Sequence, residues 1–138
     1  MRAFHTFVKV RYAETDQMGV VHHANYPLYL EIARLEWLDD LGISYKWMEE
    51  NGVKLPVHEL TLSYKKPAYF DDRLKVVTTL SKIPTVRIHF DYQIFNQQEE
   101  LLCTASTELV FMDTQRNRPM RCPEYILEKL QDSFTFTP

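Results

Sequence analysis

The residues best suited to chemistry lie in one run near the start of the chain, from Arg11 to Tyr26. A strand-like segment leads into the carboxylate of Asp16, Gly19 supplies a turn, and a helix is expected to begin near Asn25. This order places an acid beside a helix N-terminus, where backbone N–H groups lack intrahelical partners and the dipole is positive. A carboxylate facing oriented amides can hydrolyse an acyl group, because the amides hold the developing oxyanion and the acid acts as base or nucleophile.

Asp16 also has a simpler interpretation, because Asp often caps a turn with its side chain. Residue type and position alone leave the catalytic and the turn-capping interpretations open. Gly19 fits both, since a glycine permits the tight loop that separates the acid from the helix.

The same run resembles the hot-dog-fold acyl-CoA thioesterases of the 4-hydroxybenzoyl-CoA thioesterase type, close to the bacterial short-chain acyl-CoA thioesterase branch. The family pattern of Arg-Tyr-x-(Glu/Asp)-Thr-Asp, then Gly-(Val/Ile)-Val, then Asn/Ser-Tyr before an aromatic-rich helix is matched from Arg11 to Tyr26. A second segment, from Leu62 to Ala68 followed by Asp71 and Asp72, is also similar to the family. The resemblance extends over nearly the whole chain.

The resemblance implies roles for individual residues. Asp16 matches the catalytic carboxylate, which either activates water or attacks the thioester to form a short-lived anhydride. The backbone amide of His23 matches the donor to the thioester oxygen, and some relatives also use a histidine ring at this position. Gly19 completes the implied catalytic loop. Coenzyme A is then part of the substrate, and neither a cofactor nor a metal is required.

Contacts to the substrate are less specific than the catalytic loop. Coenzyme A carries phosphates, so a basic rim is expected. Tyr26 is equally suited to the helix core, and His22 to the surface. The candidate substrate-binding residues are Tyr26, His22, Lys65, Lys66, Lys82 and Arg87.

The bulk composition limits the alternatives. The 138 residues, 45% of them hydrophobic, favour one globular domain over 1–138. The net charge of −3 does not indicate the excess of positive charge that is typical of nucleic-acid-binding proteins. No apolar run is long enough to cross a bilayer. Cys103 and Cys122 have no metal-binding spacing, and a reduced cytoplasm is the expected compartment. The sequence also lacks a Gly-x-Ser-x-Gly elbow, which argues against a serine hydrolase.

Hydrophobic periodicity predicts the elements. Apolar residues at helical spacing predict a helix that starts after an Asn25 N-cap and stops at Gly42, with Glu31 and Arg34 paired on its other face. A short helix is expected from Ser44 to Asn51. The remaining segments are read as strands at 4–12, 58–64, 74–81, 86–94 and 101–112, a loop at 113–121 and a helix from Pro123.

One amphipathic helix needs a sheet to cover its apolar face, so the fold class is α+β. The resemblance specifies a hot-dog fold, in which a curved antiparallel sheet wraps one long central helix. It also implies a homodimer or homotetramer with the active site at the dimer interface. The expected function is acyl-CoA hydrolysis. A hot-dog hydroxyacyl-thioester dehydratase and a non-enzymatic module that binds acyl thioesters or acyl carrier protein are the alternatives.

Overall fold

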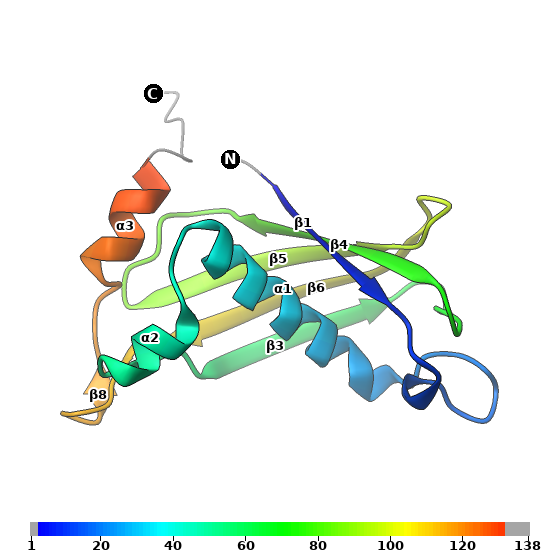
Figure 1. The fold of residues 1–138 in the computed structure, drawn as a ribbon, viewed down its shortest axis with the longest axis horizontal. Helices are drawn as coiled ribbons and strands as arrows, with labels where there is room; N and C mark the ends of the chain where they lie inside the picture. Colours follow the sequence, from blue (N-terminus) through cyan, green and yellow to red (C-terminus); the bar gives the residue numbers. More distant parts are fainter. Residues whose placement is uncertain (1–2, 132–138) are drawn as a thin grey trace.

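The structure is a computed structural model that describes residues 3–131. A five-stranded antiparallel sheet in the order β1-β4-β5-β6-β3 curves around one long helix, α1, which lies across its concave face (Figure 1). The α+β hot-dog prediction is therefore confirmed. The main sheet consists of β1 (Phe4–Lys9), β3 (Val57–Tyr64), β4 (Arg73–Leu80), β5 (Arg87–Phe95) and β6 (Leu101–Val110), and the helices are α1 (Tyr26–Asp40), α2 (Tyr45–Glu50) and α3 (Glu124–Gln131).

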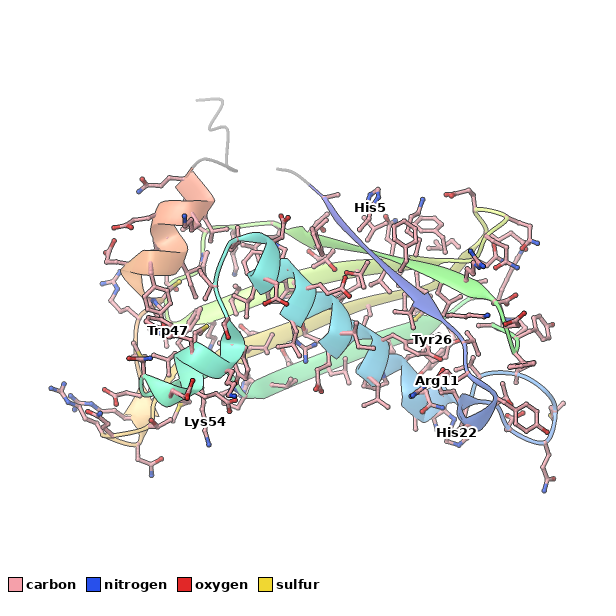
Figure 2. All side chains as sticks on the ribbon, viewed as in Figure 1. His5, Arg11, His22, Tyr26, Trp47 and Lys54 are labelled. Carbon is pink, nitrogen blue, oxygen red and sulfur yellow. The ribbon has the colours of Figure 1, made fainter. Side chains whose placement is uncertain are left out.

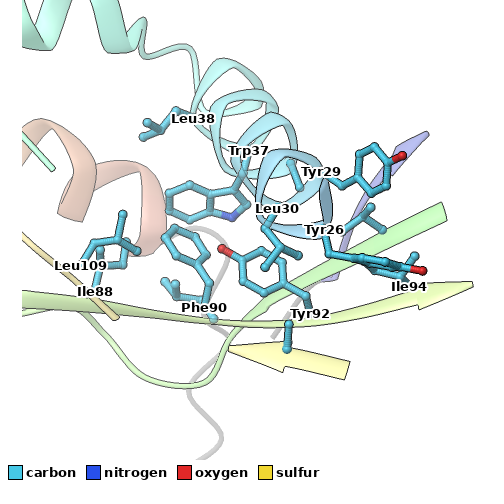
Figure 3. Packing of buried hydrophobic residues seen from close by; sticks show 14 of the residues in the cluster. Tyr26, Tyr29, Leu30, Trp37, Leu38, Ile88, Phe90, Tyr92, Ile94 and Leu109 are labelled. Atoms are coloured by element: carbon cyan, nitrogen blue, oxygen red, sulfur yellow. The ribbon is translucent and has the colours of Figure 1, made fainter. Parts of the chain in front are cut away.

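The core lies between α1 and the middle of the sheet. Leu30, Ala33 and Trp37 recur at helical spacing and are buried. Figure 3 shows Leu30 and Trp37 facing β5, where the Trp37 ring meets Phe90 edge-on with centroids 5.0 Å apart. Each fully buried large apolar side chain stabilises the fold by about 1.5–3 kcal/mol. This packing fixes the direction of α1, and with it the place of its N-terminus.

The sheet leaves β3 as an open edge. Seven of the eight β3 residues are exposed, although the strand alternates polar and apolar residues. Its apolar side chains include Val57, Leu60 and Tyr64, which are 48%, 41% and 48% exposed. Unpaired backbone groups and apolar side chains together make β3 a surface suited to association.

Two expectations from the sequence were wrong in part. The strand expected at 4–12 ends at Lys9, because the chain turns into a short 3-10 helix, Tyr12–Glu14, before which the backbone N–H of Arg11 donates to a Glu14 carboxylate oxygen at 2.8 Å. The segment 113–121, expected as a loop, contributes to a small second sheet in the order β2-β7-β8. Its strands are β2 (Val53–Lys54), β7 (Met112–Asp113) and β8 (Arg118–Pro119).

Cys103 and Cys122 are buried free thiols. Within residues 3–131, no helix has both the length and the apolar character that crossing a membrane requires.

Candidate active site

Asp16 lies in a short loop whose two ends are joined by backbone hydrogen bonds. Its backbone N–H donates to the carbonyl of Val20 at 2.9 Å, and Thr15 pairs with Val21 in an antiparallel bridge. The carboxylate oxygen Oδ1 accepts from the N–H of Met18 at 2.8 Å and of Val20 at 3.4 Å. Oδ2 has no donor within residues 3–131, so this exposed carboxylate keeps one oxygen for a reactant. The turn-capping and catalytic interpretations of Asp16 are thus compatible.

Gly19 closes the loop with a left-handed backbone. Its φ is +78°, and its N–H donates to the Asp16 carbonyl at 3.0 Å. No atom lies within 4 Å of the position that a Cβ would occupy, so the requirement for glycine comes from the backbone angle and not from crowding.

A Gly19→Ala substitution is expected to destabilise the loop by about 1–2 kcal/mol, the cost of a left-handed non-glycine residue. Chemical denaturation should show a comparable fall in the free energy of unfolding. Gly42→Ala is the matched control, because Gly42 has φ +82° and also an empty Cβ position, but closes α1 at its far end. Gly19→Ala should lower turnover and Gly42→Ala should not. Equal activities would show that the backbone angle at Gly19 does not matter for the site.

A 3-10 turn, His23–Asn25, joins this loop to α1. The ring of His22 caps it, because Nδ1 accepts from the N–H of Ala24 at 3.2 Å. The backbone N–H of His23 has no acceptor in the part of the chain that the structure describes. The ring of His23 stacks on the ring of His22, with centroids 4.3 Å apart. Asn25 occupies the N-cap position of α1, as the sequence predicts, but its side chain forms no capping hydrogen bond, and its amide donates instead to the Glu14 carbonyl at 2.8 Å.

Asp16 and His23 line one hollow of about 360 Å³ at the N-terminal end of α1. Figure 2 shows Arg11, His22 and Tyr26 gathered at this end, with Trp47 and Lys54 at the other. The remaining lining residues are Val20, Val21, Tyr26, Tyr64, Lys65, Lys66 and Pro67. The structure thus brings the predicted acid and the predicted amide donor to the same cavity.

Two tyrosines form the wall of this hollow. Tyr26 is almost fully buried, and its ring meets Tyr64 edge-on with centroids 5.1 Å apart. Burial, and then the neighbouring Cys103, raises the pKa of Tyr26 to about 12, so this residue is neutral and serves as a wall. The Tyr64 hydroxyl donates to the His23 carbonyl at 3.1 Å and so holds the 3-10 turn against β3.

The predicted basic residues separate into two groups. Lys65 and Lys66 line the hollow, and Lys66 is held by Glu100 at 2.8 Å. Lys82 and Arg87 lie at the opposite end of the sheet within one chain, where Arg87 pairs with Glu108 at 3.4 Å. His22 caps its turn and is not among the residues that line the hollow.

Sequence reasoning missed two residues of the site, Glu14 and Tyr64. Both stand inside the quoted motifs, but the sequence gives no reason to separate them from their neighbours. The spacing of Arg11 and Glu14 was the available signal, because the two side chains form an ion pair at 3.0 Å. Glu14 is 6% exposed, which a carboxylate tolerates only when it is well hydrogen-bonded.

A second cavity of about 470 Å³ lies farther along α1, between α1, α2 and the start of β3. Leu35, Leu38 and Phe90 give it apolar walls, and Arg34 and Glu31 add charge. The ion pair expected between Glu31 and Arg34 is not formed, because Arg34 points inward and donates to the Tyr92 hydroxyl at 3.4 Å.

Among the described residues, no group of three or more His, Cys, Asp or Glu side chains is placed to hold a metal ion. The hollow offers one carboxylate, one backbone amide without an acceptor among the described residues, a helix N-terminus and two lysine side chains.

Comparison with known proteins agrees with this geometry. A family model described as the thioesterase-like superfamily matches residues 10–130. The YneP protein of Bacillus subtilis is 37% identical over 114 residues, 83% of each chain. The acyl-CoA thioester hydrolase YbgC of Escherichia coli O6:H1 is 31% identical over 124 residues, which are 90% of this chain and 92% of YbgC. The solved structure of DHNA-CoA thioesterase from Staphylococcus aureus is 35% identical and has a TM-score of 0.87. The matched region covers 99% of this chain and 98% of the S. aureus chain. The chain therefore belongs to the thioesterase-like superfamily and is a hot-dog thioesterase.

Proposed function

We propose that this protein hydrolyses acyl-CoA thioesters, with Asp16 as the catalytic carboxylate and the His23 amide as the oxyanion donor. The observation that carries the proposal is the shared hollow, in which a carboxylate with an uncommitted oxygen lies with an N–H that has no acceptor among residues 3–131. The name of YbgC, an acyl-CoA thioester hydrolase that covers nearly the same length, supports the same substrate class.

In the base-catalysed form, Asp16 removes a proton from water as the water oxygen bonds to the thioester carbonyl carbon. The carbonyl oxygen becomes negative and accepts a hydrogen bond from the His23 N–H, a donor that is already in place before the charge develops. The intermediate collapses as the C–S bond breaks, and the sulfur leaves with the proton that Asp16 received. In the nucleophilic form, Asp16 itself bonds to the carbonyl carbon, the thiolate leaves, and water hydrolyses the anhydride. Both forms give one carboxylic acid and one thiol.

We further propose that Lys65 and Lys66 contact the phosphates of coenzyme A. Both line the hollow, and the Glu100 contact fixes the position of the Lys66 ammonium. An acyl carrier protein could present the same thioester arm. Arabidopsis thaliana acyl-acyl carrier protein thioesterase ATL3, 34% identical over 131 residues, is named for that substrate.

The functional unit that we propose is a homodimer joined through β3. The strand is an open edge, and it continues into exposed apolar residues on α1, namely Leu28, Ile32 and Leu35. Antiparallel pairing of two β3 strands across a twofold axis would satisfy their free backbone groups and cover these side chains. A tetramer would be a pair of such dimers.

This pairing would also connect the two cavities. An axis near Leu60 places the Val57 end of one strand beside the Tyr64 end of its partner. The larger cavity adjoins Val57 and the hollow contains Tyr64, so each Asp16 would face the larger cavity of the other copy. We propose that the acyl group enters that cavity. Its volume of about 470 Å³ leaves room for an aromatic acyl group, and the name of the S. aureus DHNA-CoA thioesterase points to that class.

Release of free thiol from a panel of acyl-CoAs tests the proposed function. The panel spans short, medium, long and aromatic acyl groups, and acyl carrier protein thioesters form a parallel arm. We expect saturable turnover on at least one class, with the aromatic group preferred, and no change after extensive chelation. Absence of turnover on every substrate would contradict the proposal, and activity restored only by a divalent ion would contradict the metal-free mechanism.

A further inference from the structure

Glu14 is a buried carboxylate whose four hydrogen-bonding and ionic contacts come from two residues, Arg11 before the catalytic loop and Tyr29 of α1 after it. Oε1 accepts from the Arg11 backbone N–H and from the Tyr29 hydroxyl, both at 2.8 Å. Oε2 accepts from Nε of Arg11 at 3.1 Å and lies 3.0 Å from its Nη2. The side chain therefore joins the segment that follows β1 to the N-terminal part of α1.

The backbone of the same residue forms two more links. The Glu14 carbonyl accepts from the backbone N–H of His22 at 2.9 Å and from the side-chain amide of Asn25 at 2.8 Å. One residue thus contacts the chain before Asp16, the chain after Gly19, the 3-10 turn and α1.

These links lie immediately around the proposed reacting groups. Asp16 is two residues after Glu14, and His23 is the residue after His22, which Glu14 holds. The Thr15–Val21 bridge closes the intervening loop. The hydrogen bonds of Glu14 and the Thr15–Val21 bridge together consequently set the separation between the Asp16 carboxylate and the His23 amide.

Glu14 is not itself placed to react. Its side chain is 8% exposed, it is not among the residues that line the hollow, and its oxygens are occupied by donors. Burial favours a raised pKa, but the hydrogen bonds from the Arg11 backbone and Tyr29, and then the Arg11 guanidinium, outweigh it and lower the pKa of Glu14. The group is a fixed anion and not a proton carrier.

We propose that Glu14 is a positioning residue that acts through Asp16, by holding the carboxylate and the His23 amide at the spacing that thioester hydrolysis requires. The inference rests on the proposed function. A displacement of about 1 Å at such a site can cost roughly 10²-fold in rate.

The test measures kcat and KM for Glu14→Ala and Glu14→Gln in the wild-type and in the Asp16→Asn backgrounds. Glu14→Ala should lower kcat by about 10- to 100-fold with KM nearly unchanged. Glu14→Gln should recover part of that loss, because its amide oxygen can still accept from Arg11 or Tyr29. In the Asp16→Asn background, Glu14→Ala should cause no further loss, since residues that act as a unit are not additive. Ile126→Val on α3 is the control for mild destabilisation, and it should leave kcat unchanged.

Amide hydrogen exchange supplies a readout that does not depend on turnover. Glu14→Ala should increase exchange across residues 15–24, whereas Asp16→Asn should leave that segment protected. Three results would overturn the proposal: an unchanged kcat in folded Glu14→Ala, a further multiplicative loss on top of Asp16→Asn, or unchanged exchange in the loop. Full activity of Asp16→Asn alone would instead refute the role of Asp16, which is a separate failure of the proposed function.

Discussion

Replacing Asp16 by asparagine is expected to lower kcat for acyl-CoA hydrolysis by roughly 10²–10⁴-fold, the usual loss when a general base is removed. The asparagine side chain has nearly the same shape, and its oxygen can still accept from the Met18 N–H, which Oδ1 contacts at 2.8 Å. The loop should therefore keep its conformation while the side chain loses the ability to take a proton or to attack the thioester.

Circular dichroism and chemical denaturation of Asp16→Asn should match those of the wild type. Asp39→Asn is the matched control, because Asp39 is an exposed carboxylate near the far end of α1. It should retain full turnover. A folded Asp16→Asn variant with near wild-type kcat would remove Asp16 from the mechanism, whatever the identity of the substrate.

Leu60→Lys is expected to dissociate the proposed homodimer and to abolish activity together with assembly. Leu60 is 41% exposed in the middle of β3, so a twofold axis at this strand brings the two copies of the residue close together. Like charges placed opposite each other at an interface cost several kcal/mol, and each 1.4 kcal/mol is tenfold in the dissociation constant. Light scattering beside the thiol-release assay should show loss of dimer and loss of turnover at the same protein concentration.

Phe7→Lys is the control for this substitution. Phe7 is 70% exposed on β1, which forms the opposite edge of the sheet. Phe7→Lys should therefore leave both dimerisation and turnover intact. A monomeric Leu60→Lys protein with wild-type turnover per chain would mean that one chain builds the complete site, and the shared-site proposal would be wrong.

Local patterns in the sequence predicted most of the fold. The long helix, the short second helix and the four strands after them followed from periods of 3.6 and 2, because each element buries one face. The order of strands in the sheet did not follow from those patterns, because the hydrophobic periodicity within a strand does not indicate which other strand it pairs with. The resemblance to the hot-dog family provided the architecture that the structure confirms.

At the site, the sequence pattern pointed to Asp16 and the family resemblance to the His23 amide, but neither indicated which residues hold them in place. Asn25 illustrates the limit, because it does take the N-cap position of α1, while its side chain binds the Glu14 carbonyl and does not cap the helix. The ring of His22 caps the preceding 3-10 turn. Both outcomes depend on the tertiary approach of the loop to α1, which local propensity does not include. Lys82 and Arg87 were chosen for charge alone, and within one chain the sheet places them far from the hollow.

The most direct test of the proposed hydrolysis is product analysis by mass spectrometry after incubation of the purified protein with an acyl-CoA in ¹⁸O-labelled water. We expect one free coenzyme A and one carboxylic acid for each thioester consumed, with a single labelled oxygen in the acid when substrate is in excess. Recovery of the intact thioester in a complex with the protein would indicate a binding module. A dehydrated acyl-CoA formed from a hydroxyacyl substrate, without release of thiol, would indicate a dehydratase, and either result would contradict hydrolysis at Asp16.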